Sequence, residues 1–452
     1  MAKADKKTRK LKAEKAASKD AVGKKGKGKA KATGAVKAPP PVSPLAPASF
    51  PALPPVDGVL FATGAAGVRY ANRTDVMLVD IAPGSTVAGV FTRSATRSAA
   101  VLDCQDKIAK LSDRHKHGFA IVVNSGNANT FTGARGASDV AAISEAAGRA
   151  VGIPADHVFT SSTGVIGEPL PASRITDILP ELVTRLAADR MQEAARAIMT
   201  TDTFPKGAAE KVEIAGKTVT IAGIAKGSGM IAPDMATMLA YVFTDANVTR
   251  DGLQSMLSAA TRTSFNAITV DSDTSTSDTV LLVATGRAHG VPISSGRSAE
   301  GRVFAAALDR VMRDLALQIV RDGEGATKLV EVRVSGAKSA RDADKVARAI
   351  ANSPLVKTAI AGEDPNWGRV VMAVGKSGAA ADRDLLSIRF GEILVAEKGW
   401  VAESYREKDG ADYMKGQELT ISVDLGLGRG EATVWTCDFT SRYIEINADY
   451  RS

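Results

Sequence analysis

The segment 226–239 holds a threonine at a position where it could become a nucleophile. Thr237 comes directly before the apolar run 238–243, which predicts a buried strand and places the threonine at a strand edge facing a pocket. If the Ala236–Thr237 peptide bond is cleaved, Thr237 gains a free α-amine that can serve as general base for its own hydroxyl. The segment therefore allows a self-cleaving enzyme with an N-terminal threonine nucleophile. Taken alone, however, it favours the simpler interpretation, a buried threonine that begins a strand.

Other catalytic or ligand-binding patterns are weak in this chain. The four histidines lie outside the strings that carry chemistry, so no Ser-His-Asp arrangement has a good candidate (His115, His117, His157, His289). A new N-terminal α-amine has a pKa of about 8, which burial lowers, so it can replace histidine as the base.

Nucleotide and metal sites are also not expected. The Gly-Ser-Gly of residues 227–229 lacks the third glycine of a dinucleotide loop, and its lysine precedes the glycines instead of following them as in a P-loop. The aspartates of the segment 271–278 lack the central glycine and distal glutamate of a calcium-binding EF-hand loop. Cys104 and Cys437 match no metal-ligand spacing, and we expect no disulfide. We therefore predict no metal and no redox cofactor.

Seven strings, taken in order along the chain, resemble the ornithine acetyltransferase family, the bifunctional glutamate N-acetyltransferases of arginine biosynthesis. They are Ser-Ser-Thr-Gly-Val-Ile-Gly at 161–167, Met-Thr-Thr-Asp-Thr at 199–203, Lys-Gly-Ser-Gly-Met-Ile-Ala-Pro-Asp-Met-Ala-Thr-Met-Leu at 226–239, Ser-Phe-Asn-Ala-Ile-Thr-Val-Asp at 264–271, Asp-Gly-Glu-Gly-Ala-Thr-Lys at 322–328, Ala-Gly-Glu-Asp-Pro-Asn-Trp-Gly-Arg at 361–369 and Ile-Asn-Ala-Asp-Tyr-Arg-Ser at 446–452. Their number and order make the resemblance specific.

The resemblance implies a role for each candidate site residue. Thr237 is the nucleophile, with cleavage between Ala236 and Thr237, and Thr163 and Gly164 are the oxyanion donors. Lys226 faces the substrate carboxylate and Glu324 the substrate amine. The remaining substrate-binding positions are Thr200, Asn447 and Ser452. Thr201 adjoins Thr200, and which of the two contacts the substrate is open.

Local sequence alone also allows a structural role for these residues. Thr163 and Gly164 could form an ordinary β-turn, Lys226 could be a solvated surface lysine, and Glu324 an ordinary carboxylate at a helix end. Ser452 stands where the family more often ends in threonine, and it keeps the hydroxyl. The pocket contact is therefore expected to be retained.

As function, the resemblance implies a self-processing N-acetyltransferase that moves acetyl from N2-acetylornithine to glutamate through acetyl-Thr237. Whether acetyl-CoA also loads Thr237, which would make the enzyme bifunctional, stays open. An N-terminal-threonine amidohydrolase or aminopeptidase is the alternative. Cleavage would leave an α fragment of 236 residues and a β fragment of 216, and an α2β2 heterotetramer is expected, although the size of the assembly is open.

Charge is distributed unevenly along the chain. Residues 1–50 carry 14 Lys and Arg against three acidic residues, whereas the rest carries 44 basic and 47 acidic residues. A Lys-, Ala- and Pro-rich stretch without a hydrophobic core predicts a disordered extension, and nucleic-acid binding through it is not favoured. No run of about 18 apolar residues exists to span a membrane, and no secretory signal precedes the body, so a cytoplasmic protein is expected.

The elements that must position the candidate residues alternate between short strands and amphipathic helices. Strands are predicted at 76–81, 119–123, 212–221, 239–243, 280–284 and 330–334, and later at 386–390, 419–423, 433–437 and 443–446. Helices are predicted at 141–151, 175–199, 250–265, 298–321 and 340–353.

This order predicts mixed α/β layers instead of a doubly wound sheet. The resemblance implies stacked sheets sandwiched by helices, as in N-terminal-nucleophile enzymes, with a smaller C-terminal α/β domain. We predict a disordered extension over 1–55, a main domain over 56–338 and a C-terminal domain over 339–452, whose tail returns to the active site.

Overall fold

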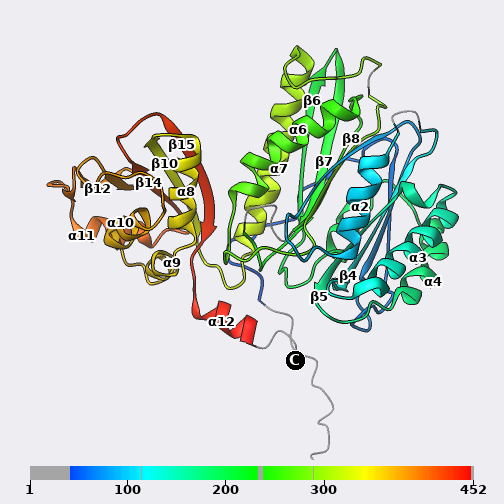
Figure 1. Ribbon diagram of the computed structural model, residues 1–452, viewed down its shortest axis with the longest axis horizontal. Coiled ribbons are helices and arrows are strands. Elements are labelled where there is room, and N and C mark those ends of the chain that lie inside the picture. The colour runs from blue at the N-terminus through cyan, green and yellow to red at the C-terminus, as the bar shows by residue number, and fades with distance from the viewer. Residues whose placement is uncertain (1–40, 113–114, 233–237, 289, 449–452) are drawn as a thin grey trace, which may run out of the picture. The chain divides into compact units, whose positions relative to one another are not determined.

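The computed structural model describes residues 41–112, 115–232, 238–288 and 290–448 (Figure 1). Within the described residues the strands form three sheets. The first has the order β1-β2-β4-β5, the second β3-β9-β8-β7-β6 and the third β13-β12-β11-β14-β10-β15. The fold is therefore mixed α/β, as predicted.

The first two sheets stack on each other. The first contains β1 (Val59–Gly64), β2 (Val76–Ile81), β4 (Phe119–Asn127) and β5 (Val158–Val165). The second contains β3 (Thr86–Phe91), β6 (Lys206–Ile214), β7 (Lys217–Lys226), β8 (Leu239–Thr244) and β9 (Thr279–Ala284). Alternate residues of both sheets, such as Phe61 and Phe243 with ring centroids 5.2 Å apart, form one buried core between them.

Helices cover the outer face of each sheet (Figure 1). Against the first sheet lie α3 (Gly133–Val151) and α4 (Ala172–Thr184), and against the second α6 (Arg250–Thr263) and α7 (Ala299–Arg321). The short helices α2 (Ala99–Lys110) and α5 (Met191–Ala197) contribute to the core between the sheets. The result is a helix–sheet–sheet–helix sandwich, which confirms the expected layering.

The third sheet belongs to the C-terminal part of the chain. Its strands are β10 (Leu329–Ala337), β11 (Ser387–Phe390), β12 (Ile393–Glu397), β13 (Trp400–Val401), β14 (Glu418–Asp424) and β15 (Gly430–Cys437). Its hydrophobic core includes residues of α8 (Ala340–Ala351), α9 (Pro354–Ala361), α10 (Trp367–Gly375) and α11 (Glu407–Met414). Strand β10, which precedes the expected domain boundary at 338/339, is hydrogen-bonded within this sheet.

Three predicted elements differ from the structure. The single strand predicted at 212–221 is a hairpin of β6 and β7, because Ala215 and Gly216 both have positive φ (51° and 72°) and form a tight two-residue turn. The long helix predicted at 175–199 is divided into α4 and α5. The strand predicted at 443–446 is instead the helix α12 (Ser441–Ala448), none of whose residues is buried.

The segment before β1 also differs in part from the expected extension. The backbone N–H of Ser43 donates to Thr203 Oγ1 at 2.9 Å, and its hydroxyl donates to the Arg321 carbonyl at 2.6 Å. Phe50 and Leu53 pack against the core between the two sheets. Residues 42–55 are therefore ordered against the body, whereas residues 1–40 lie outside the described part of the chain.

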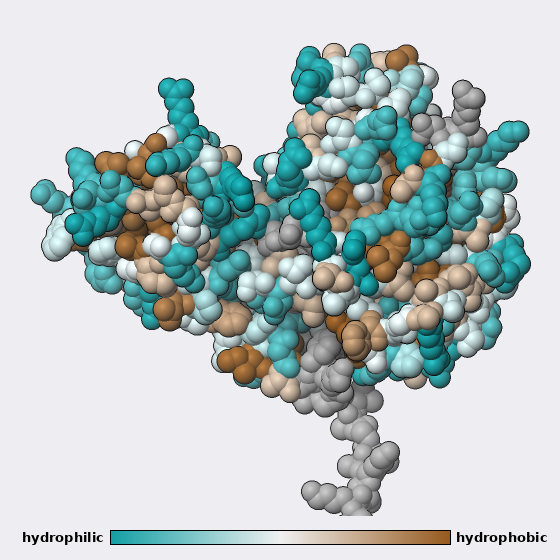
Figure 2. All heavy atoms as spheres, in the orientation of Figure 1, coloured by the Kyte–Doolittle hydropathy of each residue, from teal (hydrophilic) through white to brown (hydrophobic). Residues whose placement is uncertain are grey.

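On the face drawn in Figure 2, hydrophobic residues occur in small separate groups among hydrophilic ones. Among the described helices, none combines the length and the apolar character that crossing a membrane requires.

Candidate active site

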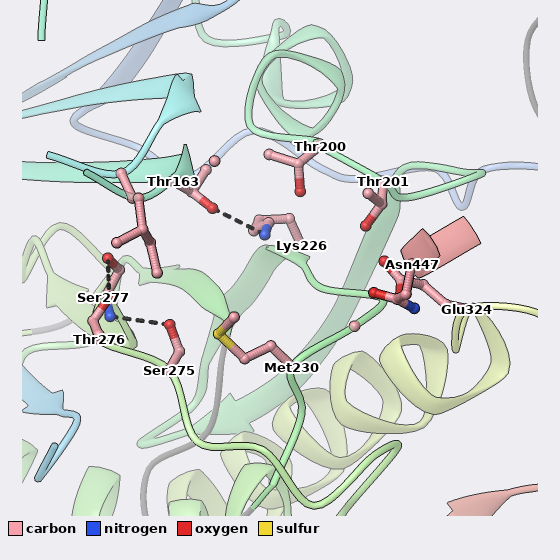
Figure 3. A pocket seen from close by; sticks show the side chains of 14 residues that line it. Thr163, Thr200, Thr201, Lys226, Met230, Ser275, Thr276, Ser277, Glu324 and Asn447 are labelled. Atoms are coloured by element: carbon pink, nitrogen blue, oxygen red, sulfur yellow. Dashed lines mark hydrogen bonds between the residues drawn. The ribbon is translucent and has the colours of Figure 1, made fainter. Parts of the chain in front are cut away.

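One pocket gathers most of the predicted site residues (Figure 3). It encloses about 810 Å³, including its opening to solvent. Its lining comes from β5, β7, helix α12 (Ser441–Ala448) and six loops, and consists of Ala128, Thr163, Gly164, Ile166, Thr200, Thr201, Lys226, Gly229, Met230, Ser275, Thr276, Ser277, Glu324 and Asn447. Thr163, Gly164, Thr200, Lys226, Glu324 and Asn447, which are separated by up to 284 residues in sequence, therefore meet in one place.

Thr163 and Gly164 lie near the end of β5 and not in an isolated β-turn, which corrects the local alternative. Strand β5 runs parallel to β4, and Gly164 pairs with Gly126. A Cβ on Gly164 would lie 2.3 Å from the carbonyl carbon of Gly126, and its φ of 130° is strained for any other residue. Glycine at this position therefore allows the close approach of β5 to β4, and Gly164 also lines the pocket.

Lys226 is the last residue of β7 and is buried, not solvated at the surface. Its Nζ donates a hydrogen bond to Thr163 Oγ1 at 3.0 Å (Figure 3). Burial lowers the pKa of Lys226, while the carboxylates of Asp202, Asp278 and Glu324 oppose that shift. A cation thus lies against the predicted oxyanion donor.

Asp202, which the sequence did not single out as a site residue, hydrogen-bonds to segments that form the pocket. Its Oδ1 accepts from the Gly227 N–H at 2.7 Å and from Lys206 Nζ at 2.7 Å, and its Oδ2 accepts from the Thr200 N–H at 2.9 Å. It therefore connects two walls of the pocket. Burial opposes its ionisation, but Lys206 and Lys226 lower its pKa overall.

Lys206 is fully buried and lies between Asp202 and Asp322. Its Nζ is 2.5 Å from Asp322 Oδ2, and it donates its third hydrogen bond to the Phe204 carbonyl at 3.3 Å. Asp322 also accepts from the N–H and hydroxyl of Thr203. This network holds the loop of Thr200, the end of β7 and the end of α7 together.

Glu324 forms the opposite side of the pocket from Thr163 (Figure 3). Its Oε2 accepts from Asn447 Nδ2 at 2.8 Å, so α12 brings the C-terminal end of the described chain to the pocket. Burial raises the pKa of Glu324, although hydrogen bonds from Asn447 and Thr201 act to lower it. A Cβ on Gly229 would lie 2.5 Å from the Glu324 carboxyl group, so glycine is what leaves room for it.

The described residues that flank the predicted cleavage site are held by two aspartates. Asp271 accepts from the N–H groups of Met230 (2.6 Å) and Ile231 (2.8 Å), and Asp278 accepts from the N–H of Met238 at 2.9 Å. Burial raises the pKa of Asp278 well above its ordinary value, although the hydrogen bond from the Met238 N–H and the charge of Lys226 act to lower it. The first residue of β8, Leu239, pairs directly with Lys226.

Ala236, Thr237 and Ser452 lie outside the described residues. Among the described residues, no group of three or more His, Cys, Asp or Glu side chains is arranged to hold a metal ion. Cys104 and Cys437 are free and buried. The pocket thus combines hydroxyl and backbone groups with a buried cation at one end and a carboxylate with an amide at the other, which suits a substrate that bears both a carboxylate and an amine.

Comparison with known proteins identifies the family. Residues 60–452 match the model of the ArgJ family. The arginine biosynthesis bifunctional protein ArgJ of Ruegeria pomeroyi is 67% identical over 412 residues, which cover 91% of this chain and 98% of the relative. The protein of the same name from Brucella suis is 55% identical over 414 residues, covering 91% and 99%.

Among solved structures, the crystal structure of the arginine biosynthesis bifunctional protein ArgJ from Bacillus halodurans is 42% identical, covers 46% of this chain and 97% of its own, and has a TM-score of 0.45. The family-model match over residues 60–452 and the two relatives, at 67% and 55% identity, show which family this chain belongs to. This chain belongs to the ArgJ family.

Proposed function

We propose that this chain is a self-processing N-acetyltransferase that transfers acetyl from N2-acetylornithine to glutamate through an acetyl-Thr237 intermediate. Membership of a family whose relatives are named for arginine biosynthesis supports the pathway. The observation that carries the proposal is the single pocket that joins Thr163, Lys226 and Glu324. Strand β8, which begins two residues after Thr237 in the sequence, pairs with β7 at Lys226.

The proposed chemistry is a double displacement. The Thr237 hydroxyl attacks the acetyl carbonyl carbon, and its α-amine takes the proton. Thr163 and Gly164 stabilise the oxyanion, and the amide breaks to release ornithine. Glutamate then attacks the acyl-threonine ester through its amine and leaves as N-acetylglutamate. Because the chain supplies nucleophile, base and oxyanion donors, the proposed reaction needs no metal or redox cofactor.

Both substrates are α-amino acids or their N-acetyl derivatives, and the charges of the pocket suit them. Lys226 is assigned to the α-carboxylate, and Glu324 with Asn447 to the amine. Thr200 and Ser452 are assigned to substrate binding as well. The buried cation and the carboxylate at opposite ends of the pocket support this assignment.

A second candidate activity is acetylation of glutamate by acetyl-CoA, which would also load Thr237. The word "bifunctional" in the names of the relatives favours it. Expression in cells that lack acetylglutamate synthase tests it directly, since an enzyme that only recycles acetyl groups cannot start the cycle and would not restore growth without arginine.

The main proposal is tested with purified protein, N2-acetylornithine and glutamate. Stoichiometric release of ornithine and N-acetylglutamate is expected, and Thr237→Ala should abolish both. Release of free acetate faster than transfer to glutamate would instead identify an amidohydrolase.

The strand order also supports a stable complex of the two cleavage fragments. Strands β8 and β9 would belong to the β fragment, yet they lie between β3 and β7 of the α fragment in one sheet. Each has six buried residues. We therefore infer that the two fragments stay together after cleavage. From the resemblance to the family, we also propose an α2β2 assembly and a cytoplasmic location. Native mass spectrometry tests the stoichiometry, with a single αβ unit as the contradicting result.

A further inference from the structure

The hydrogen bond between Lys226 and Thr163 has a direction that chemistry fixes. A lysine ammonium has three N–H donors and no acceptor, whereas a threonine hydroxyl has one proton and two acceptor lone pairs. The 3.0 Å contact between Nζ and Oγ1 is therefore donated by Lys226 and accepted by Thr163. Within the described ranges it is the one hydrogen bond recorded for Thr163 Oγ1, so the hydroxyl proton is left for a partner in the pocket.

We propose that Lys226 is a positioning residue for the oxyanion donor, because its ammonium occupies the acceptor side of Thr163 Oγ1 and directs the hydroxyl proton into the pocket. This inference rests on the proposed acetyl transfer and adds a second role for Lys226 beside contact with the substrate carboxylate. It concerns the rate of the chemical step, whereas carboxylate contact concerns substrate binding.

The role follows from how charge develops in the reaction. When the Thr237 oxygen bonds to the acetyl carbon, the π electron pair of the carbonyl moves onto its oxygen, and the threonine proton passes to the α-amine. The Thr163 O–H then donates a hydrogen bond to that oxyanion. Lys226 keeps its three protons throughout, and its charge strengthens the Thr163 donor at no cost of reorientation.

This role requires the charged form of Lys226. Burial lowers the pKa of Lys226 and the charge of Lys206 adds to that effect, whereas Asp202, and to a smaller extent Asp278 and Glu324, oppose it. Asp202 also fixes the backbone next to Lys226 through the Gly227 N–H. Asp202 thus supports both the position and the charge of the ammonium.

A double-mutant cycle distinguishes positioning from substrate binding. The rate of Thr237 acetylation at saturating N2-acetylornithine is measured for wild type, Lys226→Met, Thr163→Ala and the double variant, per processed chain counted by intact mass. Each single variant should lose about 100-fold in this rate, the effect of removing one oxyanion donor. If Lys226 acts through Thr163, Lys226→Met should cost less than about threefold in the Thr163→Ala background. If the rate loss of the double variant equals the product of the two single-variant losses, the inference is overturned.

The chain provides a matched control. Lys357 in α9 is also buried and donates to a threonine hydroxyl, Thr436 Oγ1 in β15, at 2.7 Å, but it does not line the pocket. Lys357→Met should lower the melting temperature and leave the acetylation rate within about twofold. An equal rate loss in this variant would mean that Lys226→Met acts through general destabilisation, and the inference would fail.

Lys226→Arg covers the case in which Lys226→Met does not self-cleave. It keeps a donor-only cation, so its acetylation rate should stay within about tenfold of wild type, and a 100-fold loss in processed Lys226→Arg would overturn the inference. Acetyl transfer by the wild type is measured first. If the wild type does not transfer acetyl to glutamate, the proposed function is refuted. If the wild type is active but the effects of Lys226→Met and Thr163→Ala are additive in free energy, only the role of Lys226 is refuted.

Discussion

Replacing Lys206 with methionine tests whether the buried ion cluster holds the pocket walls together. Lys206 and both of its carboxylate partners have fully buried side chains, and its three N–H groups are all used, at 2.7 Å to Asp202, 2.5 Å to Asp322 and 3.3 Å to the Phe204 carbonyl. Methionine fills a similar volume without charge. The variant would leave two buried carboxylates close together without the cation between them.

Breaking a buried pair in this way costs about 3–5 kcal/mol of unfolding free energy. The control Arg310→Met removes an exposed ion pair with Glu210, in which the arginine side chain is 57% exposed, and should cost less than about 1 kcal/mol. Urea unfolding followed by circular dichroism at pH 7.5 gives both values. A loss for Lys206→Met no larger than that of the control would refute the reasoning.

The pH dependence of the loss supplies an independent check. In the wild type the lysines lower the pKa of Asp202, so the stability that its charge contributes is present above the unfolded pKa of about 3.9 and disappears as pH falls through the folded pKa. Without Lys206, burial and mutual repulsion should raise the pKa of Asp202 above that unfolded value. They should also raise further the pKa of Asp322, which burial already raises in the wild type. The deficit of the variant should therefore shrink from pH 8 to pH 5. A deficit independent of pH would contradict this account.

Two glycines give further predictions. Gly229→Ala should leave the fold intact but push the Glu324 carboxyl group, which lies 2.5 Å from the new Cβ, and so raise KM for N2-acetylornithine about tenfold with a smaller change in kcat; an unchanged KM would contradict the assignment of Glu324. Gly164→Ala should reduce transfer more than about 100-fold and lower the melting temperature, because its Cβ would meet the Gly126 backbone at 2.3 Å. The control Gly167→Ala, also at positive φ but with nothing within 4 Å, should cost only about 1 kcal/mol of stability and keep activity; equal losses in the two variants would show that backbone strain alone is responsible.

Local periodicity predicted elements well where one face or both faces of an element are buried. The predicted strand at 76–81 coincides with β2, and the predicted helix at 298–321 begins one residue before α7. The strand predicted at 443–446 is wrong because a window of four residues does not distinguish period 2 from period 3.6. The helix that occupies it buries no residue, so it has no apolar stripe to detect.

The network around Asp202 could not be predicted from spacing. Lys206 lies four residues away from Asp202, but Asp322 lies 116 residues beyond Lys206, and only the end of α7 brings it to the same place. The alignment of Lys226 with Thr163 likewise depends on two strands from different sheets. The resemblance predicted Thr163, Lys226 and Glu324 as pocket residues. The ion pairs of Lys206 that hold the pocket walls together could be identified only from the structure.

The most direct test of the account is the intact mass of the purified, active protein beside that of Thr237→Ala. The account predicts two polypeptides for the wild type, of 236 and 216 residues with threonine at the N-terminus of the second, and one uncut chain without transferase activity for the variant. A wild type that is fully active as one unbroken chain would contradict the central claim, since Thr237 would then have no α-amine to act as its base.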